Sequence, residues 1–288
     1  MTSNMGKVVS NETSDGFWYL LLPLLVLRNL WNHRDLIRQL IKREVGQRYR
    51  GSYLGVLWSF ITPLLMLLIY TFVFSVIFKS SWKTGTETPV GEFALTLFAG
   101  LAAFNLFSEL VNRAPTLILA VPNYVKKVVF PLEILPVVAV GSALINSMIT
   151  AGLVLIGCAL ILGQFSRTIF LLPLVYLPLC LLSLGLAWFL ASLGVYVRDV
   201  GQGISIVVQM LFFLSPVFYP VSVVPEPFRS VISINPLTLI LTEFRQTLLW
   251  GEVLDFKVWG LWLALTVMLA ILGYIWFMKT KKGFAGVM

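Results

Sequence analysis

The sequence predicts an all-α membrane protein with six transmembrane helices, an N-terminal amphipathic interface helix and short re-entrant gate helices on the outer side. Of its 288 residues, 58% are apolar and only 12% are charged. Soluble domains carry about 25% charged and about 45–50% apolar residues. The apolar residues also gather in long charge-free runs, as spanning helices require. These features exclude a soluble enzyme, a fibrous protein and a disordered chain.

Six charge-free runs predict the spans, because a helix needs about 20 apolar residues to cross a hydrocarbon core about 30 Å thick. The run 17–27 contains Pro23 and is too short to cross, so we expect it at the membrane interface. The six runs are 53–78, 93–108, 134–166, 168–197, 200–225 and 258–278. The predicted regions are a disordered tail 1–16, a cytoplasmic segment 17–52, a transmembrane domain 53–278 and a cytoplasmic tail 279–288.

The distribution of charge orients the chain. Fifteen of the 21 lysines and arginines fall on the side that holds both termini, and six fall on the other side. Cytoplasmic loops carry the excess of these residues, so both termini are expected in the cytoplasm. The acidic residues divide seven to six, which leaves the whole net charge of +8 on the inner side. Topology, anionic membrane lipids and a cytoplasmic partner explain this charge, so no nucleic acid is required.

Three inner segments stand out. Residues 32–45 predict an amphipathic helix that lies in the membrane plane with its apolar face toward lipid. This helix is either a plain anchor or a docking surface for a soluble subunit, and the basic link 46–52 into the first span favours docking. In the loop 113–130, residues 114–121 predict a short helix that Pro122 ends. The turn at Arg198 and Asp199 is either a local ion pair or a partner contact.

The outer segment 220–250 is rich in proline and predicts one or two short helices that dip back into the membrane to cap or gate a passage. Six aromatic residues are not readily assigned to interfacial belts or lipid contact. Their flat faces, most of them with a polar tip, suit contact with a sugar polymer in a pore, although plain packing remains the alternative. They are Tyr53, Trp58, Tyr70, Tyr196, Phe218 and Tyr219.

The sequence carries no recognisable catalytic, metal or nucleotide motif. Its single histidine, His33, lies in a basic segment, and Cys158 and Cys180 lie inside apolar runs. It contains no GxxxxGK[ST] or HExxH string, and no GxSxG with a usable base. No span carries a charge at mid-depth, where ion-coupled carriers usually need one. We therefore expect no cofactor in this chain.

Five strings, in order over about residues 30–250, carry a family resemblance. They are KREVGQRYRGSYLGVLW at 42–58, FPLEILP at 130–136, YVRDV at 196–200, SPVFYP at 215–220 and NPL at 235–237. Together they resemble the membrane permease subunits of type-2 ABC exporters, most closely the branch that exports polysaccharides such as O-antigen, capsule and teichoic acid. The N-terminal extension with the run 17–27 departs from that pattern.

The resemblance implies a homodimer in the bacterial inner membrane that moves an undecaprenyl-linked polysaccharide. Two copies of a separate cytoplasmic ATPase would bind ATP and Mg, and the outer loop would form the gate. The implied ATPase-coupling residues are Arg38, Lys42, Arg43, Asn123, Tyr124, Lys126, Lys127, Arg198 and Asp199. The substrate would enter near Arg48, Tyr49, Arg50, Leu54 and Gly55, and the six aromatic residues would line the channel. The alternatives are a type-2 exporter of a drug or another lipid, an ion-coupled carrier acting alone, and a membrane-embedded glycosyl- or acyltransferase.

Overall fold

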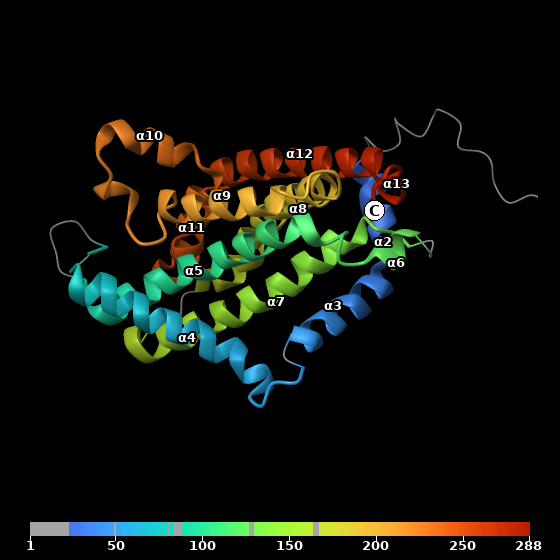
Figure 1. The fold of residues 1–288 in the computed structure, drawn as a ribbon. Helices are drawn as coiled ribbons and strands as arrows, with labels where there is room; N and C mark the ends of the chain where they lie inside the picture. Colours follow the sequence, from blue (N-terminus) through green and yellow to red (C-terminus); the bar gives the residue numbers. More distant parts are fainter. Residues whose placement is uncertain (1–22, 49, 80, 83–87, 127–129, 164–166) are drawn as a thin grey trace, which may run out of the picture.

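A computed structural model describes residues 23–48, 50–79, 81–82, 88–126, 130–163 and 167–288. These residues form a bundle of helices joined by short turns, and no strand occurs among them (Figure 1). The predicted all-α class is therefore confirmed. The tail 1–16 and the first part of the run 17–27 lie outside the described residues.

Five helical stretches are long and apolar enough to cross a membrane, so the chain is a multi-pass membrane protein. The first contains α4 (Trp58–Thr71), which a 3-10 turn precedes and a π-helical turn continues to Ile77. The others are built on α5 (Val90–Arg113), α7 (Ile134–Gly157), α8 (Leu172–Tyr196) and α12 (Phe256–Lys281). Each coincides with one of the predicted runs to within several residues at either end.

The run expected as the fifth span forms a shorter helix, α9 (Val200–Leu214). Its 15 residues reach about 22 Å at 1.5 Å per residue. The helix ends early because Ser215 takes an extended backbone, as a residue before proline prefers. The count of six spans therefore stays a prediction. The described N-terminal helix and the C-terminal helix nevertheless lie at the same end of the bundle, which we call the inner end (Figure 1).

The inner end begins with α2 (Pro23–Asn32) and α3 (Arg34–Arg48). The apolar side of α3 packs on α7, where Leu40, Ile134 and Val138 form a small buried cluster. The expectation that this side faces lipid is thus wrong in the described chain, because α7 offers an apolar surface of its own. The helix also runs three residues beyond the predicted end, so the link to α4 is shorter than expected.

The loop between α5 and α7 also differs from its prediction. A 3-10 turn, Ala114–Thr116, follows α5, and a short helix, α6 (Pro122–Lys126), comes next. Pro122 begins this helix instead of ending one. Proline suits the first helical position because its missing N–H would have no partner there, and its fixed φ angle matches a helix.

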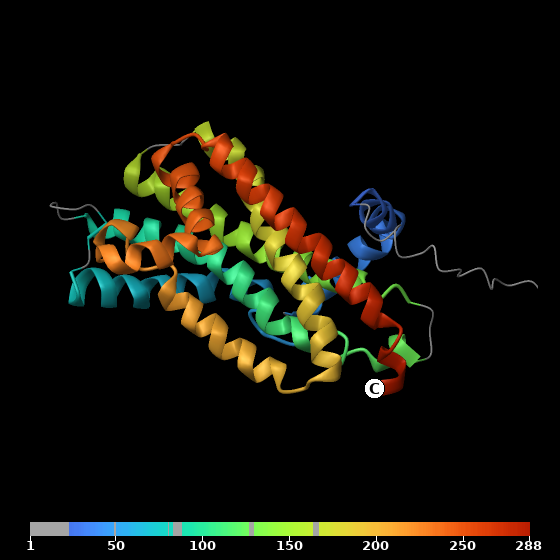
Figure 2. The same ribbon diagram turned by 90° about the horizontal axis from the view of Figure 1, so that it is seen from above.

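The core sits around α5 and between α8 and α12. Most side chains of α5 are buried, and α8 and α12 lie along each other (Figure 2). The two helices approach closely where Gly185 faces Gly273, because a Cβ on either glycine would meet the backbone of the other helix. The terminal helix α13 (Phe284–Val287) docks on this pair through Phe284, which is fully buried against Phe277.

Two short helices, α10 (Glu226–Ile234) and α11 (Pro236–Arg245), occupy the segment 225–250 at the outer end, and a π-helical turn follows α11 to Trp250. Helix α11 lies against α5 and α8 and is mostly buried. Asn235 starts α11 by accepting a hydrogen bond from the Leu237 N–H, and its side-chain amide donates to Ser215 Oγ at 2.9 Å. This contact joins the SPVFYP and NPL strings, which are 20 residues apart in sequence.

Candidate functional site

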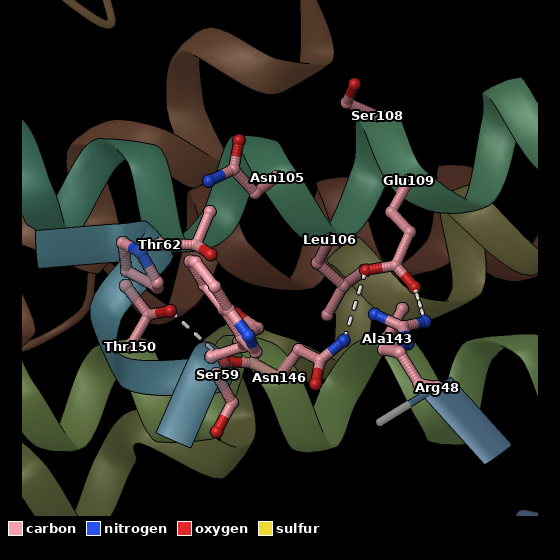
Figure 3. Close-up of a pocket in the computed structure, with 13 residues that line it drawn as sticks. Arg48, Ser59, Thr62, Asn105, Leu106, Ser108, Glu109, Ala143, Asn146 and Thr150 are labelled. Atoms are coloured by element: carbon pink, nitrogen blue, oxygen red, sulfur yellow. Dashed lines mark hydrogen bonds and ion pairs between the residues drawn. The ribbon is translucent and has the colours of Figure 1, made fainter. Parts of the chain in front are cut away.

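A polar cleft of about 430 Å³ lies between α4, α5 and α7. Glu109 of α5, Asn146 of α7 and Arg48 of α3 point toward one another at one side of it (Figure 3). Hydroxyl and amide groups within membrane helices are costly unless they find partners or water, and such groups commonly mark a site. Those that line this cleft are Ser59, Thr62, Asn105, Ser108, Asn146, Ser147 and Thr150.

A second groove of about 300 Å³ lies next to the cleft, between α5 and α9. Asn105 and Ser108 line both the cleft and the groove, so polar side chains continue around the open face of α5. Ser205 and Gln209 of α9 also line the groove, and their spacing of four places them on one helix face. Sequence reasoning missed these residues. The sequence does carry a signal for them, because polar residues recur at helical spacing within apolar runs. They stand at positions 105, 108 and 112 in one run and at 205 and 209 in another.

Two ion pairs attach α3 to α5. Arg48 pairs with Glu109 and Arg113 pairs with Glu44, all four side chains being between about a fifth and two fifths exposed. The spacing is four residues on each helix, so the pairs sit one turn apart. They also explain why α5 continues past the predicted end at 108: the charges of Glu109 and Arg113 are met by α3. Arg48, expected where substrate enters, therefore sits at the edge of the cleft.

The structure describes most of the other residues near which the substrate is expected to enter. Arg50 and Leu54 are exposed, and Gly55 begins the 3-10 turn that leads into α4. Trp58 lines the cleft and donates from Nε1 to Ser52 Oγ at 3.0 Å. Tyr49 lies outside the described residues.

The expected coupling residues come from three segments at the inner end. Arg38, Lys42 and Arg43 are exposed on α3, as are Arg198 and Asp199 in the turn before α9. Asn123 is exposed on α6, whereas the Tyr124 ring stacks on Phe130 with 4.5 Å between centroids. Lys126 ends α6, with its side chain outside the described set, and Lys127 lies outside the described residues. Arg43, Glu44, Thr116 and Tyr124 line one small cleft between α3 and the loop.

The six expected channel aromatics do not share one location. Tyr70 and Phe218 meet at 5.4 Å in a cluster with Phe74, Phe212 and Phe213 toward the outer end, which we call the outer aromatic cluster. Tyr219 lies beside it and donates from its hydroxyl to the Phe213 carbonyl. Tyr53 and Trp58 are exposed near the start of α4. Tyr196 lies at the inner end, where its hydroxyl donates to the Thr280 carbonyl.

Glu133, in the FPLEILP string, is a junction of four helices that sequence reasoning did not single out. Its buried carboxylate accepts hydrogen bonds from Lys281 Nζ of α12 at 2.6 Å and from the Asn29 amide of α2 at 3.0 Å. Its backbone carbonyl accepts from Trp188 Nε1 of α8 at 3.0 Å. Glu133 itself immediately precedes α7. The loop 113–130 holds four of the expected coupling residues, and we call it the coupling loop. Glu133, just after this loop, is thus tied to helices from both ends of the chain.

A multi-pass helical bundle with a polar cleft along a central helix is an arrangement that membrane transporters use. Comparison with known proteins identifies the kind. The chain matches the sequence model of the ABC-2 type transporter family over residues 35–249. It therefore belongs to that family, and the predicted resemblance is confirmed.

Three relatives illustrate the match. The O-antigen export system permease protein RfbA of Myxococcus xanthus is 31% identical over 223 residues, which cover 76% of this chain and 82% of that protein. A protein of the same name from Klebsiella pneumoniae is 24% identical over 269 residues, covering 93% of this chain and 100% of the relative. The polysialic acid transport protein KpsM of Escherichia coli is 27% identical over 224 residues, covering 75% and 82%.

The Glu133 junction predicts a pH-dependent contribution to stability. Burial alone would raise the pKa of the Glu133 carboxyl, but hydrogen bonds from Lys281 and Asn29 outweigh it and hold the pKa below its ordinary value of 4.5. A carboxyl with a lowered pKa stabilises the fold above its unfolded-state value and loses that contribution as pH falls through the folded value. Near neutral pH we expect wild type to have a higher melting temperature than Glu133→Gln. This difference in melting temperature should shrink below pH 4.5.

Melting temperatures in detergent, measured for both proteins from neutral to acidic pH, test this expectation. Glu252→Gln at the exposed outer end is the control, and it should stay close to wild type throughout. A gap between wild type and Glu133→Gln that is equally wide at every pH contradicts the role assigned to the carboxylate.

Proposed function

We propose that this chain is the membrane-channel subunit of an ATP-driven ABC exporter that moves a lipid-linked polysaccharide, of the O-antigen type, from the cytoplasm across the bacterial inner membrane. The observation that carries the proposal is the polar cleft and groove around α5. The names of the relatives support the choice of cargo, since they are called O-antigen export and polysialic acid transport proteins.

The chemistry of the lining suits a sugar chain. Hydroxyl and amide side chains both donate and accept hydrogen bonds, as sugar hydroxyls do, and the Trp58 ring at the cleft offers an aromatic face. The two charged residues of the cleft, Arg48 and Glu109, are paired with each other. A path lined by neutral polar groups holds each sugar weakly, which allows a long polymer to slide through it.

A homodimer would complete the path. Asn105, Ser205 and Gln209 are exposed, and so are Ile206, Val207 and Met210 beside them on α9. The span that contains α4 has no buried residue in its most apolar window. A second copy of the chain set against α4 and α9 would cover these surfaces and enclose the polar residues between the two subunits.

Two copies of a cytoplasmic ATPase would supply the energy. The ATPase, and not this chain, would bind ATP and Mg. The exposed cations of α3, together with Asn123 of α6 and the Arg198–Asp199 turn, would form the docking surface. The ion pairs from α3 to Glu109 and Arg113 would transmit a displacement of α3 to α5, which lines the cleft. In this proposal both termini lie in the cytoplasm.

The polar cleft and groove around α5 are tested by measuring export. In a strain that lacks the gene, wild type should restore the surface polysaccharide. Asn105→Leu and Ser205→Val should reach the membrane at normal levels but reduce export by about tenfold, because each replaces a sugar hydrogen-bonding group with an apolar one. Surface glycan is quantified by gel electrophoresis and immunoblotting.

Ser233→Val is the matched control for Ser205→Val. Both serines are exposed, and each donates to a carbonyl one turn back on its own helix, but Ser233 lies on α10 away from the cleft. The control should export normally. Unchanged surface glycan in the deletion strain, with altered drug resistance instead, would move the chain to the drug-export branch.

The coupling surface has a separate test. Lys126→Glu combined with Lys127→Glu reverses two charges in the coupling loop, so co-purification with the ATPase and export should both fall. Lys257→Glu, exposed at the outer end, is the control and should change neither. A double variant that keeps both the complex and export shows that this loop does not couple the two proteins.

A further inference from the structure

Arg245, the last residue of α11, is an arginine buried without a carboxylate partner. Its side chain is 2% exposed, and no ion pair to it occurs among the residues that the structure describes. Burying a charge is costly unless the group is paired or hydrogen-bonded. The contacts of Arg245 must therefore offset the cost of burying its charge, and they show what the residue holds in place.

The guanidinium instead donates to three backbone carbonyls. Nε donates to Thr96 of α5 at 3.0 Å, Nη1 to Pro216 at 2.7 Å and Nη2 to Val217 at 2.8 Å. The Trp82 ring lies over the guanidinium at 4.3 Å. Arginine alone presents several donors in a rigid planar fork, so lysine cannot reproduce this set of contacts. Arg245 therefore ties the elbow 215–220, which follows α9, to α5 and α11.

The elbow places Phe218 in the outer aromatic cluster. Phe218 is buried and stacks on Phe74 at 4.5 Å, and it meets Phe212 edge-on at 4.8 Å. Phe212 also lines the groove between α5 and α9, with Phe104 beside it at 4.9 Å. Since α9 runs outward, Phe212 lies beyond Ser205 and Gln209. The cluster thus borders the groove at its outer end.

We propose that Arg245 is a positioning residue that fixes the elbow and thereby keeps the outer aromatic cluster closed over the outer end of the groove. The proposal rests on the proposed function, in which the groove is part of a path across the membrane. Arg245 touches no cargo in this scheme. It acts through the carbonyls of Pro216 and Val217, whose position sets that of Phe218.

A substitution at Gly100 offers a second, independent way to disturb the contacts of the Arg245 guanidinium. It lies on α5, and a Cβ built there would overlap Nη2 of Arg245. Alanine at this position must displace the guanidinium while leaving its charge intact. Gly100→Ala and Arg245→Met are thus chemically different changes on different helices, and both disturb the hydrogen bonds from Arg245 to the elbow.

The experiment measures leakage. The full-length protein is purified, reconstituted into liposomes loaded with carboxyfluorescein, and dye release is followed by fluorescence. Wild type should retain the dye. Arg245→Met, Gly100→Ala and Phe218→Ala should release it about tenfold faster, because the loss of charge-assisted hydrogen bonds or of the ring shifts the closed state toward an open one. Arg245→Lys should fall between wild type and Arg245→Met.

Two matched controls separate positioning from general damage. Arg229→Met removes an arginine that also donates to two loop carbonyls, those of Ser222 and Val224, but lies partly exposed on α10. Gly152→Ala adds a methyl group to α7 where no atom lies within 4 Å. Both should retain the dye as wild type does, and every variant is checked for its oligomer profile by gel filtration.

The outcomes are distinct. Well-folded Arg245→Met and Gly100→Ala proteins that retain dye overturn the proposal. If Arg245→Met does not fold, the pair Gly100→Ala and Phe218→Ala decides, and a leak from Phe218→Ala alone overturns the role of Arg245. Leakage does not require a polysaccharide, so a leak from these variants with no effect of the gene on surface glycan would refute the proposed cargo and leave the positioning role standing.

Discussion

The cost of placing a polar or charged group in lipid shapes this structure more than any other constraint. Helices satisfy their own backbone, but side chains and irregular segments need partners from elsewhere in the chain. Arg245 meets three carbonyls at the elbow, Glu133 meets Lys281 and Asn29, and Glu109 meets Arg48. Hydroxyl and amide side chains also gather in the cleft and groove around α5. Their concentration on one surface is what gives the bundle a candidate path.

The inner end joins that path to the surface where a partner would dock. Arg113 precedes the coupling loop and is paired with Glu44, whereas Glu133 follows it and is bound to Lys281. The loop with α6 is therefore anchored on both sides. A displacement of α6 would reach α3 through the first pair and α12 through the second. In the proposed exporter, this arrangement would pass the motion of the ATPase to the bundle.

Much of the fold was predictable because lipid imposes a simple rule on length and charge. The spans on α4, α5, α7, α8 and α12 follow from charge-free runs alone. The errors arose where a distant partner changes the rule: α5 continues past Glu109 because Arg48, 61 residues away, meets its charge. The apolar face of α3 suggested lipid, and only the three-dimensional structure places it on α7. Pro122 predicts the end of a helix, yet its ring geometry equally suits the first position of one, where the structure has it.

The candidate site was less predictable than the fold. Single polar residues in an apolar run give a weak signal, and Asn105, Ser205 and Gln209 become a site only when α5 and α9 are side by side. The prediction of channel aromatics rests on residue type alone, and the structure separates them: Phe218 lies in the outer aromatic cluster, whereas Tyr196 lies at the inner end. Residue type indicates possible contacts, but position in the bundle decides which ones occur.

The central claim is that a sugar chain passes along the open face of α5. Site-specific photocrosslinking in cells that make the surface polysaccharide tests it most directly, with benzoylphenylalanine at Asn105, which lines both cleft and groove, or at the exposed Leu261 of α12. We predict a glycan-modified form of the protein on irradiation of the Asn105 variant and none for the Leu261 variant. An exporting Asn105 variant that never captures glycan, or equal capture at both positions, would contradict the account.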